Sequence, residues 1–248
     1  MLNYIKAELY RNFNRAYYWG YVGALSILGL LFNFLSTNHN AGINLAEMFE
    51  FFTYMLSAGI FFVLPILDMT TAEEQKSQTL KNIVSFGVSR NKLILSKIIT
   101  SVILSFIALF IILIVFFGSG IIIFGIGQGF SSSILNSFMI KLLVSIILWV
   151  ASISIGILIA FFFKSNTTFT FVYMGLFAMT GKIVKGLALL VSDKFKYVGN
   201  ILITTQFKNL SEQPVTNNTL IFASVVGIVY IIVFAVLTMV YVKNMEVK

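Results

Sequence analysis

The run of residues 98–124 constrains the fold of this chain more than any other feature, because it is apolar and contains no charged side chain. An α-helix needs about 20 such residues to cross the hydrocarbon core of a bilayer. The run is therefore expected to be a transmembrane helix, with length to spare for some tilt. The rest of the chain agrees, since 58% of it is hydrophobic and only 10% is charged, whereas about a quarter of a soluble domain is charged. We predict an all-α polytopic membrane protein with a single transmembrane domain over residues 1–248.

Five further apolar segments are predicted to cross the membrane, which gives six transmembrane helices. They cover residues 16–35, 48–67, 139–163, 167–180 and 219–242. No ionisable side chain is expected near the middle of spans one to four or of span six. An ion-driven carrier needs such a side chain, so this class of transporter is disfavoured.

Residues 1–15 are predicted to form an amphipathic helix that lies in the headgroup layer. Leu2, Ile5, Leu9 and Phe13 recur at helical spacing, and the basic side chains fall on other faces. A signal peptide is the alternative interpretation. No small-x-small cleavage site follows the first span, so we expect the segment to be retained.

The region after span five holds Lys182 and Lys185 within an otherwise apolar stretch. It can form one long span that contains both lysines, or a crossing followed by a broken, re-entrant hairpin. A charge at the middle of the bilayer costs about 2.5–3.5 kcal/mol on insertion scales, so two of them favour the hairpin. We therefore expect residues 181–218 to form an external hairpin and loop.

Ser152, Gly156 and Ala160 follow one another at intervals of four residues in span four. Such a stripe lies on one face of a helix and lets a neighbouring backbone approach closely. The stripe predicts helix packing and no substrate site.

The most highly charged interval, residues 68–97, separates spans two and three. Thr71 and Glu74 have the spacing of a capping box, which predicts that a short amphipathic helix begins there and covers residues 72–84. Capping is preferred to a catalytic role for Glu73 and Glu74, because adjacent helical residues diverge by about 100° and cannot flank one bond. Gly87 ends this helix, and Ser89 is placed to cap the next one.

This interval resembles the first cytoplasmic loop of type-2 ABC exporter permeases. The resemblance rests on the Glu pair, on Thr79-Leu80-Lys81, on the residues from Gly87 to Arg90, and on Lys97 at the start of the next span. The family more often has Gly before the Thr and Pro before the Ser-Arg pair, where this chain has Gln78 and Gly87-Val88. The resemblance implies a coupling helix that docks onto a separate ATPase subunit, with the contact made by Ala72, Glu73, Glu74, Thr79, Leu80, Ile83, Val84, Ser89 and Arg90.

The distribution of lysine and arginine predicts that both termini are cytoplasmic. With this orientation the N-terminal helix, the loop of residues 68–97 and the C-terminal tail hold most of the basic residues. The short loops are therefore biased inward, as the positive-inside rule requires.

Other chemistry is excluded by what the sequence lacks. It has no cysteine, a single histidine (His39) and no GxxxxGK[ST] motif, so we expect no catalytic residue, no metal site and no bound cofactor. The resemblance implies that ATP and Mg²⁺ bind a partner. The expected partners are two ATP-binding subunits, a second permease subunit that is identical or homologous, and the lipid bilayer, but no nucleic acid.

The expected substrate is an amphipathic or hydrophobic peptide, because the spans offer an apolar surface with few polar anchors. Among the resembled permeases, many export or confer immunity to antimicrobial and cytolytic peptides, including bacitracin, lantibiotics and phenol-soluble modulins. The alternatives are a membrane sensor or scaffold subunit for peptide resistance, and an exporter of a lipid or small drug. The expected location is the bacterial plasma membrane.

Overall fold

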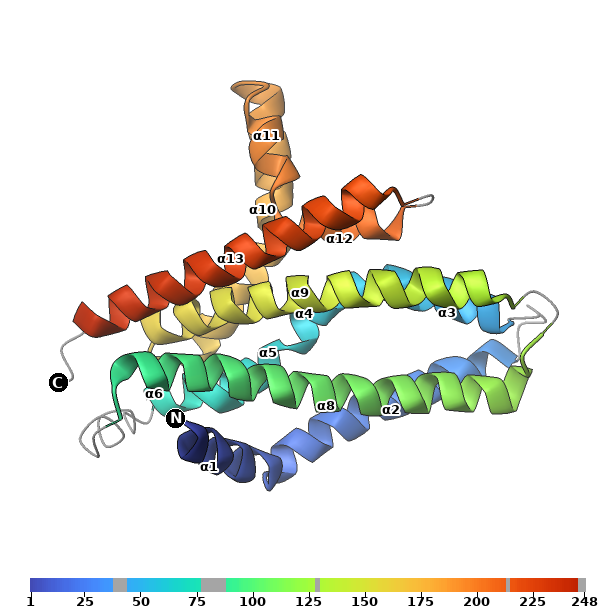
Figure 1. Ribbon diagram of the computed structural model, residues 1–248, viewed down its shortest axis with the longest axis horizontal. Helices are drawn as coiled ribbons and strands as arrows, with labels where there is room; N and C mark the ends of the chain where they lie inside the picture. The colour runs from blue at the N-terminus through green and yellow to red at the C-terminus, as the bar shows by residue number, and fades with distance from the viewer. Residues whose placement is uncertain (38–43, 77–87, 128–129, 213–214, 245–248) are drawn as a thin grey trace.

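The computed structural model describes residues 1–37, 44–76, 88–127, 130–212 and 215–244. These residues contain helices and no strand. Six helical segments are long and apolar enough to cross a membrane, which confirms the predicted all-α polytopic class. The beginning of α1 and the end of α13 lie toward the same end of the elongated bundle, and α6 lies at that end too (Figure 1).

Five of the six candidate spans are single helices, and a shorter N-terminal helix precedes them. The N-terminal helix is α1 (Leu2–Phe13), and the five spans are α2 (Ala16–Thr37), α8 (Arg90–Phe124), α9 (Ser132–Phe162), α10 (Asn166–Leu190) and α13 (Asn217–Asn244).

The second span is helical from residue 45 to residue 76 but is irregular along most of its length. Pro65 lies in this span, and proline both removes a backbone donor and distorts a helix. The segments are α3 (Leu45–Met55), the 3₁₀ turn η1 (Leu56–Ala58), α4 (Gly59–Phe62), α5 (Leu64–Leu67), the π-helical η2 (Asp68–Ala72) and α6 (Glu73–Lys76).

Side chains from three other spans donate hydrogen bonds to backbone carbonyls of this irregular segment. The Trp149 indole N–H donates to the Leu56 carbonyl at 2.9 Å, and the Tyr173 hydroxyl donates to that of Ile60 at 2.9 Å. The Tyr21 hydroxyl donates to a third carbonyl, that of Phe62. Irregular backbone is tolerated at membrane depth only where such partners are supplied, so these side chains stabilise the interruption.

The indole of Trp149 also determines which residue can stand at the interruption. A Cβ atom added to Gly59 would lie 2.2 Å from the indole nitrogen. Position 59 therefore requires glycine while the hydrogen bond from Trp149 to Leu56 is in place.

Helix α9 is the most buried span, with two thirds of its apolar window inside the structure. The predicted small-residue stripe on it is wholly buried. A Cβ atom on Gly156 would approach the side chains of Leu67 and Tyr173, so this face lies against α5 and α10. The observation agrees with a packing role for Ser152, Gly156 and Ala160.

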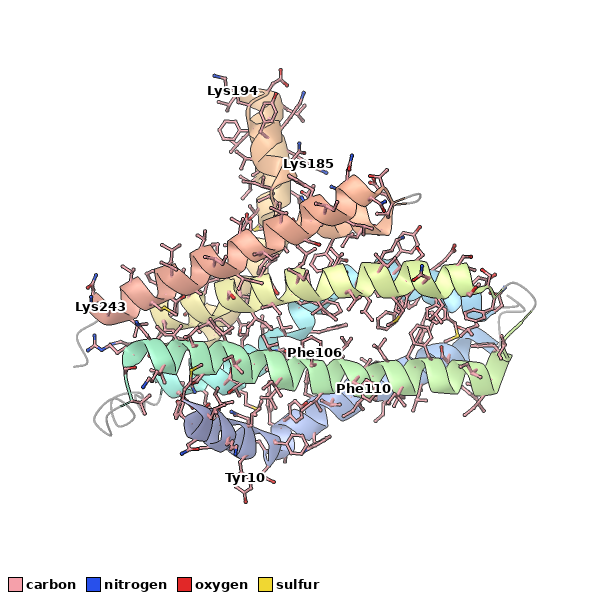
Figure 2. All side chains as sticks on the ribbon, in the orientation of Figure 1. Tyr10, Phe106, Phe110, Lys185, Lys194 and Lys243 are labelled. Atoms are coloured by element: carbon pink, nitrogen blue, oxygen red, sulfur yellow. The ribbon has the colours of Figure 1, made fainter. Side chains whose placement is uncertain are left out.

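The expected break at Gly181 and Lys182 is wrong, because α10 continues without interruption to Leu190. The chain then turns and continues into α11 (Phe195–Asn200), which packs beside α10, and into α12 (Ile203–Ser211), which returns to α9 and α13. Together α10 and α11 form an arm that stands away from the bundle, with Lys185 and Lys194 on it (Figures 1 and 2). Lys182 and Lys185 lie on the surface of this arm and are not covered by other parts of the protein.

Candidate functional site

The N-terminal helix α1 lies under the bundle near α6 and the beginning of α8 (Figure 1). Its buried residues are Ile5, Glu8 and Asn12, whereas Leu2 is 73% exposed. The face of α1 that contacts the protein therefore carries a carboxylate. Helical periodicity in the sequence indicates only apolar side chains on that face and gives no role to Glu8.

Glu8 belongs to a cluster of four charged side chains drawn from three parts of the chain, of which Glu8, Glu74 and Lys97 are buried and Arg11 is 37% exposed; we call it the buried cluster. Lys97 of α8 is fully buried, and its ammonium lies 2.7 Å from a carboxylate oxygen of Glu8. The same ammonium pairs with Glu74 of α6. Arg11 lies 3.0 Å from Glu8 and also pairs with Glu74. Each carboxylate thus contacts both cations, and the cluster joins α1, α6 and α8.

The cluster balances two positive charges with two negative ones. Such balance matters because an isolated charge at a site this dry would be strongly disfavoured. Arg11 illustrates the compensation: burial alone lowers the pKa of its guanidinium, but the carboxylates of Glu74 and Glu8 raise it, and the net pKa is raised. Burial also raises the pKa of Tyr4, with help from the same carboxylates, so its phenol stays neutral.

Arg15 and Glu73 form a second link between α1 and α6 at the edge of this cluster. Glu73 is half exposed, so this pair contributes less than the buried one. The two acidic residues that were assigned to capping therefore make ion pairs. Thr71 is buried inside η2, where the helix continues, and it does not stand at a helix start. The predicted capping box is wrong.

The beginning of α8 is tied to the end of α13. Helix α8 begins at Arg90 with Ser89 in the N-cap position, as expected, although the Ser89 hydroxyl makes no capping hydrogen bond. The Arg90 guanidinium donates to the backbone carbonyls of Val242 at 2.9 Å and Lys243 at 2.5 Å. This cation therefore joins spans three and six at the end of the bundle where the chain terminates.

The predicted coupling residues are only partly covered by the structure. Thr79, Leu80, Ile83 and Val84 lie outside the described residues, and so does most of the expected amphipathic helix. Ala72 is buried in η2, ahead of the two acidic residues. The predicted boundaries of the coupling loop, residues 68–97, also shift. Span two continues to residue 76 and span three begins at residue 90, so both spans extend into the predicted loop.

A second feature is a cavity of about 100 Å³ beside the irregular part of span two. Its walls are almost entirely apolar and come from α2, α3 to α5, α8 and α9. Leu56, Gly59 and Phe62 line it from the irregular segment, and Val102 and Val150 line it from α8 and α9. The volume is about that of one aliphatic side chain, so the cavity can receive an apolar group but offers nothing to hold an ion or a sugar.

Neither feature is a catalytic centre. Within the described ranges, no group of histidine, cysteine or acidic residues could hold a metal ion. The carboxylates of the buried cluster are neutralised by their cationic partners. The arrangement can hold α1, α6 and α8 together and transmit a movement of one to the others.

The model of a known protein family, the ABC-2 family transporter proteins, matches residues 5–181. The chain belongs to the ABC-2 transporter family. The match begins in α1, includes the buried cluster and the interrupted second span, and ends within α10. Comparison with curated proteins finds no match.

Family membership and the six apolar helices make this ABC-2 permease a multi-pass protein of the bacterial plasma membrane. It is a transport subunit, and the family associates with an ABC ATP-binding subunit. Two members of the buried cluster, Glu74 and Lys97, lie within residues 68–97, the loop that the sequence assigned to coupling. In the sequence Lys97 is the last charged residue before span three. Its two partners are distant in the chain: Glu74 precedes it by more than 20 positions and Glu8 by 89.

Proposed function

We propose that this permease is the transmembrane subunit of an ATP-driven exporter for amphipathic or hydrophobic peptides, acting in peptide export or self-immunity. The observation that carries the substrate class is the apolar cavity beside the irregular segment of span two. A wall of this kind stabilises a guest through the burial of hydrocarbon, at about 25 cal/mol per Å². It discriminates weakly between related guests, so several peptides should be carried.

The partners follow from the family and the sequence. Two ATP-binding subunits, which hold ATP and Mg²⁺, and a second permease, identical or homologous, would complete the transporter. Of the proposed coupling residues, Thr79, Leu80, Ile83 and Val84 would dock onto the ATP-binding subunit. Ala72 and Glu74, which are buried, and Arg90, which is bonded to α13, would hold the two ends of the docking segment to the bundle. The buried ionic cluster would then pass a movement of this segment to α1 and α8, because Glu74 pairs with both Arg11 and Lys97.

The function is tested with the permease co-purified with its ATP-binding subunit and reconstituted in liposomes. The probe is a synthetic amphipathic peptide of leucine and lysine, about 20 residues long. We expect the permease alone to hydrolyse no ATP, and the complex to hydrolyse it faster when the peptide is added. Hydrolysis by the isolated permease would refute the assignment of ATP binding to a partner.

The role of the cavity is tested with Val150→Phe, which fills it, and with Val229→Phe as the matched control. Val229 is 51% exposed on α13 and lies outside the cavity. Val150→Phe should reduce stimulation by the peptide and leave the basal rate unchanged, whereas the control should behave like the wild type. Equal stimulation in both variants would remove the cavity from the transport pathway.

Two alternative functions are separated by deleting the gene. Peptide export predicts that the cells accumulate amphipathic peptides or become sensitive to them, and that an ATPase-dead partner reproduces the defect. Sensitivity that an ATPase-dead partner does not reproduce would favour a sensor or scaffold. Altered efflux of a lipid or small drug, with peptide tolerance unchanged, would show that the substrate is not a peptide. The assignment of the protein as a transporter subunit would still stand.

A further inference from the structure

A second cavity, of about 180 Å³, lies between α3 and α9. It is near the end of the bundle where both helices begin, opposite the two termini (Figure 1). Its polar lining comes from Glu50 and Thr53 of α3 and from Ser133, Ser137 and Lys141 of α9. Unlike the apolar cavity, it therefore offers charges and hydroxyls to a guest.

Lys141 is the unusual member of this lining. Its side chain is only 4% exposed, yet no hydrogen bond or ion pair within 4.0 Å joins its ammonium to any residue that the structure describes. The nearest carboxylate that acts on it is that of Glu50, which is itself exposed at the cavity. Most of the Lys141 side chain is therefore covered by protein, while the residue lines the cavity and can offer its ammonium to a guest.

The depth of Lys141 indicates what completes the site. Helix α9 has 31 residues, so at 1.5 Å per residue it is about 46 Å long and overhangs a hydrocarbon core of about 30 Å at each end. Lys141 lies about 14 Å along the helix from Ser132 by the same rise, which places it just inside the hydrocarbon boundary. Side chains on a helix lean toward its N-terminus, here toward the headgroups of the outer leaflet.

We propose that this cavity binds the headgroup of a zwitterionic aminophospholipid from the outer leaflet, with the phosphate on Lys141 and the ammonium on Glu50. Lysine is a point charge suited to phosphate, and the hydroxyls of Ser133 and Ser137 can donate to the remaining phosphate oxygens. A purely anionic headgroup would leave Glu50 facing a like charge, and a quaternary ammonium could not donate to it. The proposal concerns a lipid site in this chain and does not depend on the transported substrate.

The test is native mass spectrometry of the purified permease with three probes of equal acyl chains: phosphatidylethanolamine, phosphatidylcholine and phosphatidylglycerol. The wild type should retain phosphatidylethanolamine most strongly. Lys141→Met should weaken its retention by about tenfold or more, as expected for the loss of a charge-assisted contact, and Lys141→Arg should preserve it. Glu50→Gln should remove the preference over phosphatidylglycerol. Soluble phosphoethanolamine should compete if the headgroup, rather than the acyl chains, is recognised.

Lys196→Met is the matched control, since Lys196 is exposed and pairs with Asp193 outside the cavity. It should retain the lipid like the wild type. Equal retention of phosphatidylethanolamine by Lys141→Met and by Lys196→Met would overturn the proposal, and so would equal retention of the three lipids by the wild type. Failure of phosphoethanolamine to compete would overturn recognition of the headgroup.

Discussion

Lys97→Met removes one of the two cations of the buried cluster and leaves the hydrocarbon volume of the side chain nearly unchanged. The remaining cation, Arg11, must then neutralise both Glu8 and Glu74 at a site where Lys97 was fully buried. Breaking a buried ion pair by removing one partner costs about 3–5 kcal/mol, because a buried charge is left uncompensated. We expect this loss in the free energy of unfolding, together with the undocking of α1.

The measurement is unfolding of the purified permease in detergent, followed by tryptophan fluorescence. Trp19 reports on α1, since its ring lies 4.8 Å from that of Phe13 and its indole N–H donates to the Phe13 carbonyl at 2.7 Å. Lys97→Met combined with Glu8→Gln leaves one cation and one carboxylate. The double variant should therefore be more stable than the sum of the two single changes predicts, by about 0.5–3 kcal/mol.

Lys196→Met serves as the control, because the pair of Lys196 with Asp193 is largely exposed. Exposed pairs contribute about 0–1 kcal/mol. If Lys97→Met costs no more than this control, or if the double variant shows strict additivity, the cluster does not hold α1 to the bundle. Unchanged Trp19 fluorescence in the folded single variant would refute the undocking separately.

The remaining predictions concern span two, the coupling segment and the arm. Gly59→Ala should cost about 1–3 kcal/mol in thermal unfolding, because the new Cβ displaces the Trp149 indole; no loss would show that the indole can move freely. Tyr173→Phe should cost about 1 kcal/mol through the lost hydrogen bond to Ile60, and an unchanged unfolding curve would contradict this. Leu80→Asp should abolish co-purification of the ATP-binding subunit without affecting membrane insertion, so undiminished binding would show that the coupling helix lies elsewhere. A cysteine at position 185, in a chain with no other cysteine, should react with an impermeant thiol reagent added to intact cells; labelling from the cytoplasm alone would contradict the orientation.

The six crossings could be predicted from the sequence because the requirement of the bilayer is local. A helix within hydrocarbon satisfies its own backbone, so a run of apolar residues is sufficient evidence for each span. The start of α8 at Arg90 could also be predicted, because the signal, Ser89 in the N-cap position, is adjacent to it in the chain. The resemblance of residues 69–97 to a coupling loop indicated the family that residues 5–181 match.

Only the tertiary structure decided where the charges inside that framework lie. The sequence treated Lys182 and Lys185 as a reason for α10 to break, because their burial would be costly. The helix instead continues through both lysines and leaves the bundle as an arm, with both side chains on the surface of the protein. The position of the helix relative to its neighbours could not be known from the sequence.

The same reason explains the buried cluster and the unpartnered lysine. Glu8 and Lys97 are 89 positions apart, and no periodicity within either helix indicates that they meet. Lys141 falls near the start of the predicted span 139–163, and its burial beside α3 depends on how two helices pack. Apolar segments are determined by the solvent around them, whereas the partner of a buried charge is determined by three-dimensional packing of segments that are distant in the chain.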